Sequence, residues 1–343
     1  MREQDVVDLL QQNFSSLFPS LTLLDWQTGP PADLQLRVAV GQSRAEKRLL
    51  CEVKARGEPR ILREAGYQLQ QYLTAGARGY PVVVTPYVSD RGRQVCKEIG
   101  ISFLDLSGNA LLDLGDFYFE VEGKPNSYKA SRSLKSLFQG RSERVLRALL
   151  TDPKRRWTLR ELAAEVGISL GYASEIAHRL DEQEWVERSR TGGLRLVAPT
   201  DLLDRWREEY TYRRSPITEL YGLGEVADLE RAVADYCREQ GTNYAFTLFS
   251  GANLVAPFTR YLQIAFYFSG HPATLQERLG FKPVSSGANV LVLRPYDVGV
   301  FHGAQQVRDR RVVGNIQLYL DLYGYKGRGR EQAEFLREQV IGF

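Results

Sequence analysis

The sequence TLRELAAEVGISLGYASEIAHRL, at residues 158–180, carries the clearest structural signal in the chain. Thr158 and Glu161 have the spacing of a capping box, in which the hydroxyl and the carboxylate each satisfy a free backbone donor of the following helix. That helix is predicted to end at the glycine turn of Gly167, and Ser169 is placed to cap a second helix. Apolar residues at helical spacing give both helices one buried face. The stretch is therefore predicted to form a helix-turn-helix.

The flanking residues extend this pattern on both sides. An apolar-periodic helix is expected at 142–151, followed by a short strand at Trp157 and Thr158. Two strands, 185–190 and 194–197, are expected around a glycine turn. The order helix, strand, helix, turn, helix, hairpin resembles the winged helix-turn-helix DNA-binding domains, and we assign it to residues 142–199. Such a domain also serves as a protein-interaction module in some proteins, so this alternative stays open.

The resemblance predicts which side chains contact duplex DNA. A recognition helix reads base edges with donors and acceptors near its N-terminal half. The residues expected to do so are Ser169, Gly171, Tyr172, Ser174, Glu175, His178 and Arg179. Phosphate contacts are expected from Arg188, Arg190 and Arg195 in the wing and from Arg141 and Arg144 at the first helix. No cofactor is required for this binding.

Composition sets the broader limits. The chain has 343 residues, of which 43% are hydrophobic and 25% charged, and this predicts a globular protein of two or three domains. The net charge of +3 excludes a polybasic binder, but residues 129–156 contain nine basic side chains and only two acidic ones. The positive charge is therefore concentrated where the predicted winged helix begins.

Cysteine and histidine are too sparse for two common classes of site. The three cysteines are far apart without a CxxC pair, and there are only three histidines, which argues against zinc and against a disulfide framework. The acidic N-terminus does not fit a signal peptide, and no stretch is long and apolar enough for a membrane span. A soluble cytoplasmic protein without a membrane partner is expected.

Before the winged helix, strand and helix patterns alternate. This alternation predicts an α/β domain with a partly parallel sheet at residues 1–125, followed by a basic connector at 126–141. Its helices are expected at 3–14, 60–76 and 90–98, and its strands at 33–40, 48–54, 80–87 and 101–106.

Two acids and a lysine lie at the ends of neighbouring strands in this domain. Asp33 is at the start of one strand, and Glu52 and Lys54 are at the end of the next. Paired carboxylates hold Mg²⁺, and a nearby lysine stabilises charge on a phosphate. The arrangement resembles the PD-(D/E)XK nucleases, which have the restriction endonuclease-like fold. The helix with Gln68 and Tyr72 four residues apart is similar to that of the RecB-type branch.

The resemblance implies a catalytic site of Asp33, Glu52, Lys54, Gln68 and Tyr72, with Asp33 and Glu52 as metal ligands. A first-helix acid present in some relatives corresponds to Asp5, to Asp8 or to neither. The alternative is a nuclease fold that has lost activity and only binds DNA or protein, with Glu52 and Lys54 as a surface ion pair.

Residues 200–343 are expected to form an α+β domain. Two phrases in it, Gly-Ala-Asn-Val at 287–290 with Pro-Tyr-Asp at 295–297, and Gln-Leu-Tyr-Leu-Asp-Leu at 317–322 with Gly-Arg-Gly-Arg-Glu at 327–331, recur in one family. With the preceding winged helix, the domain resembles the AbiEi-like antitoxins and transcriptional regulators of type IV toxin-antitoxin systems. This resemblance implies repression of the protein's own operon and a functional link to a nucleotidyltransferase toxin.

The sequence thus supports two leading hypotheses. The first is a DNA-binding regulator whose flanking domains shape, dimerise or regulate the winged helix, with a homodimer as one outcome. The second is a Mg²⁺-dependent nuclease that the winged helix targets to DNA in phage defence. A weaker third hypothesis is an interaction scaffold.

Overall fold

The computed structural model describes every residue except 42–43, 129–136 and 190–192. It divides into two compact units, which are described separately. One is Met1–Ser133 with Arg179–Glu184, and the other is Leu134–His178 with Trp185–Phe343. Half of the predicted connector, the predicted phosphate contact Arg190 and most of the predicted wing turn lie outside the described residues. In the part of the chain that is described, no helix is long and apolar enough to cross a membrane.

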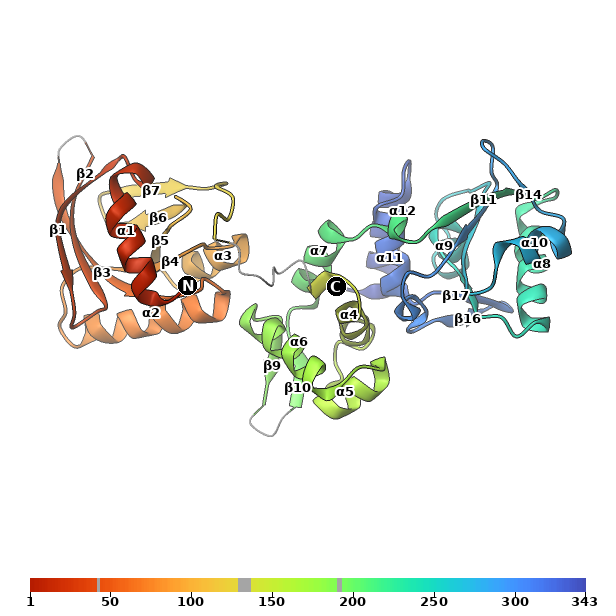
Figure 1. Cartoon of the computed structure of the whole chain (residues 1–343), viewed down its shortest axis with the longest axis horizontal. Helices are drawn as coiled ribbons and strands as arrows, with labels where there is room; N and C mark the ends of the chain where they lie inside the picture. Colours follow the sequence, from red (N-terminus) through yellow and green to blue (C-terminus); the bar gives the residue numbers. More distant parts are fainter. Residues whose placement is uncertain (42–43, 129–136, 190–192) are drawn as a thin grey trace. The chain divides into compact units, whose positions relative to one another are not determined.

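The first unit is built on one mixed seven-stranded sheet whose strands follow chain order (Figure 1). The three central strands are parallel, whereas the strands on either side pair as antiparallel neighbours. The strands are β1 (Leu21–Thr28), β2 (Leu34–Val40), β3 (Ala45–Val53), β4 (Tyr80–Thr85), β5 (Ser102–Asp105), β6 (Ala110–Asp113) and β7 (Tyr118–Val121).

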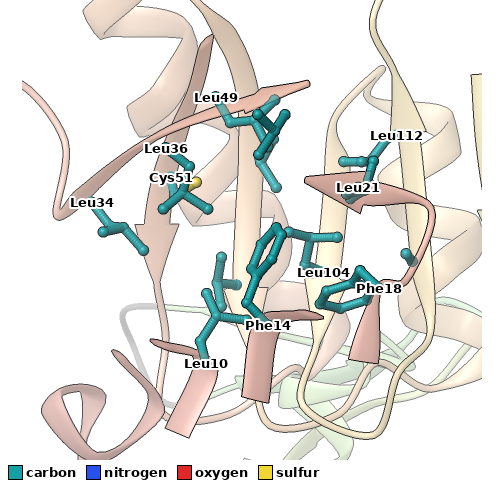
Figure 2. Close-up of a cluster of buried hydrophobic side chains, with 14 of the residues drawn as sticks. Leu10, Phe14, Phe18, Leu21, Leu34, Leu36, Leu49, Cys51, Leu104 and Leu112 are labelled. Carbon is teal, nitrogen blue, oxygen red and sulfur yellow. The ribbon is translucent and has the colours of Figure 1, made fainter. Parts of the chain in front are cut away.

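Helices cover both faces of this sheet because its central strands are apolar on both sides. Helix α1 (Glu3–Leu17) packs on the face that carries Val82 and Val84, and Figure 2 shows its Leu10 and Phe14 among the leucines of that core. Helices α2 (Pro59–Thr74) and α3 (Asp90–Glu98) supply the core on the opposite face, which carries Val83. The helices and strands predicted in this region are present, and β1, β6 and β7 are additional strands.

The second unit begins with three helices and a small sheet. The predicted capping box is present at Thr158, whose hydroxyl accepts from the Glu161 amide at 3.2 Å while the Glu161 carboxylate accepts from the Thr158 amide at 2.9 Å. Gly167 ends the second helix at a φ of 65°, a conformation that glycine adopts without strain. Ser169 then accepts from the Tyr172 amide at 3.3 Å. The elements are α4 (Ser142–Thr151), β8 (Arg156–Thr158), α5 (Leu159–Val166), α6 (Leu170–Glu182), β9 (Val186–Arg188) and β10 (Gly193–Leu196).

The rest of the second unit contains another mixed seven-stranded sheet, in the order β14-β11-β15-β13-β12-β17-β16. Its strands are β11 (Ile217–Tyr221), β12 (Tyr244–Phe246), β13 (Ile264–Phe268), β14 (Lys282–Pro283), β15 (Val290–Leu293), β16 (Gln305–Val307) and β17 (Arg310–Val312). The helices are α7 (Pro199–Glu209), α8 (Val226–Glu239), α9 (Leu248–Val255), α10 (Pro272–Leu279), α11 (Asn315–Tyr323) and α12 (Gly329–Leu336).

A buried polar cluster joins α4 to the C-terminal part of this unit. The fully buried Glu143 carboxylate accepts from Tyr296 Oη at 2.5 Å, Arg214 Nη2 at 2.6 Å and Arg147 Nη2 at 3.3 Å. Arg147 also donates to Gln317 Oε1 at 2.8 Å and 2.6 Å. The desolvation cost of burying these charges is offset only while each charge keeps its hydrogen-bond partners. The cluster therefore fixes α4 against the C-terminal part of the chain.

The same cluster continues to a second buried carboxylate, Asp321. It accepts hydrogen bonds from Tyr210 and Thr247 at 2.6 Å each, from Gln317 at 2.8 Å and from Tyr267 at 3.1 Å. Burial raises the pKa of Asp321 to about 6, although these four donors oppose the shift.

Removal of Glu143 tests the energetic weight of the cluster. Glu143→Ala leaves two arginines without their shared carboxylate, one of them buried, and we expect it to lower the free energy of unfolding by about 3 kcal/mol or more. Glu208→Ala is the matched control, because Glu208 forms a surface pair with Arg205 worth under about 1 kcal/mol. Urea unfolding measures both. Equal losses in the two variants would contradict this role of Glu143.

Asp321 gives a pH-dependent prediction. Its pKa of about 6 in the folded protein lies above the value of about 3.9 for an unfolded aspartate, so the folded state binds more protons between these values. Asp321 therefore contributes stability at low pH that is lost as the pH rises from about 4 through 6. Carboxyl-carbon NMR, assigned with Asp321→Asn, should show this titration near pH 6. A titration near pH 4 would show that burial does not control the group.

Candidate functional site

The strand register in the first unit brings the predicted acids and lysine together. Leu34 of β2 pairs with Cys51 of β3, so Asp33 lies beside the end of β3. The Val53 amide donates to Asp33 Oδ2 at 2.9 Å. Lys54 Nζ lies 2.6 Å from Glu52 Oε2 and 3.8 Å from Asp33 Oδ2. One cation thus lies between two carboxylates at the ends of adjacent strands.

The two carboxylates have different surroundings. The Glu52 side chain is 1% exposed and that of Asp33 is 46% exposed. Burial raises the pKa of Glu52, while the hydrogen bond with Lys54 opposes the rise. Burial lowers the pKa of Lys54, but its interactions with Glu52 and Asp33 outweigh this and leave it above its ordinary value. The Lys54 ammonium and the buried Glu52 carboxyl therefore lie next to the solvent-exposed Asp33 carboxylate.

Helix α2 contributes the remaining two predicted residues. Gln68 Nε2 donates to Tyr72 Oη at 2.6 Å, as expected for side chains one helical turn apart. Tyr72 acts to lower the pKa of Glu52, which places its hydroxyl near that carboxylate. The structure therefore brings Asp33, Glu52, Lys54 and Tyr72 to one place, with Gln68 orienting the tyrosine.

Sequence reasoning missed one acid near this cluster. The charge of Glu3, at the start of α1, raises the pKa of Lys54. Asp5 instead pairs with Arg2 at 3.0 Å, and Asp8 accepts from Gln4 at 2.8 Å. Of the first-helix alternatives, the structure thus favours neither Asp5 nor Asp8. In the sequence, the one signal for this role of Glu3 is its position as the first residue of the helix.

The carboxylate oxygens of Asp33 and Glu52 are chemically suited to bind Mg²⁺. Glu52 Oε1 is buried and has no hydrogen-bond partner, and the carboxylates of Asp33 and Glu52 are the hard donors that this ion prefers. Among the described residues, no group of three or more His, Cys, Asp or Glu side chains is arranged to hold a metal. The protein would therefore supply two carboxylates and leave other positions to water, backbone oxygen or substrate.

A second candidate site lies on α6 and the small sheet of the second unit. Ser169 and Gly171 are exposed at the start of α6, and Tyr172 and Ser174 are half-buried. Further along the helix, Glu175 and Arg179 are half-buried and His178 is exposed. The buried face is formed by other residues, namely Ala173, Ile176, Ala177 and Leu180. The predicted base-reading residues therefore lie off the buried face of α6.

The predicted phosphate contacts differ in their surroundings. Arg141 and Arg188 are exposed, and Arg195 pairs with Glu187 at 2.7 Å. Arg144 instead donates two hydrogen bonds of 2.7 Å to Asp297 and is only 18% exposed. Asp297 is 153 residues away in sequence, so no local pattern could reveal this pairing.

Strand β8 adds basic side chains that the sequence reasoning did not assign to the site. Arg156 on β8 lies directly opposite Arg195 on β10, and both are exposed. Like charges in directly opposed positions of a sheet are destabilising, and here Glu187 on the next strand partly offsets them. Arg155 lies over the Trp157 ring at 3.5 Å. The small sheet thus presents a positive surface suited to anions.

Comparison with known families covers the C-terminal part of the chain. Residues 195–342 match the family model described as transcriptional regulator, AbiEi antitoxin, type IV TA system. The resemblance predicted for residues 200–343 is confirmed by this match, which leaves residues 1–194 uncovered. No curated protein and no solved structure gives a significant match to the chain.

Proposed function

We propose that the protein is a DNA-binding transcriptional regulator whose α4–β10 segment, Ser142–Leu196, acts as a winged helix-turn-helix. The observation that carries this proposal is a capped helix-turn-helix next to a small sheet with opposed arginines, followed directly by a segment similar to AbiEi-type regulators. Helix α6 has 13 residues and is about 20 Å long, which is a suitable size for the major groove.

In this proposal, α6 reads the bases and the sheet positions the protein on the backbone. Ser169, Gly171 and Tyr172 lie at the N-terminal end of α6, which is the part of a recognition helix that meets base edges. Phosphates between Arg156 and Arg195 would relieve the repulsion of the two cations. Arg144 is left out because Asp297 already occupies its guanidinium.

The family match supports an antitoxin-like role. By analogy, the protein would repress its own operon and counteract a nucleotidyltransferase toxin encoded beside it. Duplex DNA is then the direct partner, and the toxin is a functional one.

Salt dependence tests the DNA-binding proposal. Arg156→Gln with Arg195→Gln removes two proposed phosphate contacts, so the slope of log K against log salt should become less steep by about 2. Arg231→Gln with Arg278→Gln, two exposed positions elsewhere in the same unit, controls for the change in net charge. Fluorescence anisotropy with a DNA duplex gives the slopes. The same slope in both double variants would contradict the proposed surface.

The Asp33–Glu52–Lys54 cluster favours a second candidate function, Mg²⁺-dependent cleavage of DNA. Asp33 and Glu52 would hold the ion, which when bound would polarise a phosphate and activate water. Lys54 would place a positive charge beside the reacting phosphate, and Tyr72 would restrain Glu52. The unpartnered Glu52 Oε1 supports this reading, because buried polar atoms rarely remain unsatisfied without a role.

Cleavage assays with a charge-neutral variant test this second function. With Mg²⁺, the unmodified chain should nick duplex DNA and Glu52→Gln should not, while both bind DNA equally. Glu46→Gln is the control, since Glu46 lies on the same strand but is exposed. No cleavage by the unmodified chain with Mg²⁺ or Mn²⁺, or cleavage by all three proteins, would exclude this site as a nuclease.

A further inference from the structure

A hollow of about 420 Å³ lies in the second unit, where the end of α8 meets the hairpin of β16 and β17. Its walls come from the turn after α8, from the first residue of β12 and from the two strands of the hairpin. The hollow is open to solvent, since Arg238, Asn243 and Gln306 in its walls are exposed. Small-molecule sites usually have volumes of about 300 to 1,000 Å³. The hollow is therefore large enough for a metabolite, and neither candidate function above uses it.

A glycine turn after α8 forms the first wall of the hollow. Gly241 has a φ of 62°, which side-chain-bearing residues rarely adopt, and its amide donates to the Arg238 carbonyl oxygen at 3.3 Å. The Thr242 amide donates to the Cys237 carbonyl oxygen at 2.9 Å, which closes the helix end. The turn thereby places Thr242 and Asn243 in the wall. The C-terminal end of a helix disfavours anions, so an anionic ligand requires cations that outweigh this effect.

Arg238 supplies one such cation and connects α8 to the hairpin. It donates to Asp235 Oδ1 at 2.9 Å and to the carbonyl oxygen of Asp309 at 3.1 Å. Arg308 and Asp309 form the hairpin turn, with φ values of 47° and 61° in the left-handed region. The Asp235 carboxylate offsets part of the Arg238 charge. The position of the guanidinium is nevertheless set by contacts with both α8 and the hairpin.

Arg311 of β17 supplies the second cation. Its guanidinium donates to Asn243 Oδ1 and lies 5.6 Å from the centre of the Phe301 ring. Within the described part of the chain, no carboxylate forms an ion pair with Arg311. Burial raises the pKa of Tyr244, and the charges of Arg238 and Arg311 both oppose this rise. The two guanidinium groups are therefore both close to Tyr244, which lines the hollow.

We propose that this hollow binds a small phosphate monoester. Such a ligand carries about 1.5 to 2 negative charges at pH 7, whereas each phosphodiester of DNA carries one. Two forked guanidinium groups match the dianion. Each has five N–H donors, of which Arg238 uses two and Arg311 uses one in the contacts above. The Thr242 hydroxyl and the amides of Asn243 and Gln306 then supply hydrogen bonds to the organic part of the ligand.

Isothermal titration calorimetry of the full chain with 5′-AMP and with glucose 6-phosphate tests the proposal. At least one of these should bind saturably, with one molecule per chain. Arg311→Gln and Arg238→Gln each remove one charged donor group and should raise the Kd about tenfold or more. Arg231→Gln is the matched control, because Arg231 lies on the same helix and pairs with Asp228 at the same spacing as Arg238 with Asp235. This control should bind as the unmodified chain does, and circular dichroism confirms that each variant is folded.

The ligand panel and the variants decide the outcome. Adenosine and glucose lack the phosphate, and 3′,5′-cyclic AMP is a diester with one charge, so all three should bind much more weakly than the monoesters. Failure of both monoesters to bind, or equal Kd values for Arg311→Gln and Arg231→Gln, would overturn the proposal. So would binding of cyclic AMP as tight as that of 5′-AMP. Weaker binding of duplex DNA by Arg311→Gln, with monoester binding unchanged, would show instead that Arg311 contacts nucleic acid and would also overturn the proposal.

Discussion

The fully buried carboxylate of Glu143 is the constraint on which the second unit depends. It lies on α4 but receives its hydrogen bonds from Arg147, Arg214 and Tyr296, two of which belong to the C-terminal part of the chain. A charge without water is tolerated only with such partners. The first helix of the proposed winged helix and the C-terminal domain are therefore held as one body, and the Arg144–Asp297 pair adds a second connection.

This constraint gives the family resemblance a physical meaning. Tyr296 and Asp297, from the Pro-Tyr-Asp phrase, bind Glu143 and Arg144 of α4. Gln317, from the second phrase, accepts a hydrogen bond from Arg147. Gln317 in turn donates to Asp321 of the same phrase. Three residues of these phrases, Tyr296, Asp297 and Gln317, thus hold the C-terminal domain to the proposed DNA-binding segment. The C-terminal domain would then set how α6 is presented to DNA.

Local signals in the sequence predicted much of the structure, and contacts between distant residues account for what was missed. The capping box at Thr158, the turn at Gly167 and the contact of Asp33 with the end of β3 follow from short spacings and strand ends. Strand β1 was missed because it is an edge strand with a register shift between Leu23 and Asp25, which disrupts its alternation. Arg144 was assigned to DNA because Asp297, its partner, is far away in sequence. The opposed arginines on β8 and β10 likewise depend on strand pairing.

A transcriptional regulator would bind promoter DNA whether or not the Asp33–Glu52–Lys54 site cleaves DNA. Genome-wide footprinting in the native host, with the unmodified chain and with Glu52→Gln, measures this binding. We expect a protected site at the promoter of the protein's own operon in both strains. If neither strain shows a protected promoter site, the chain is not such a regulator.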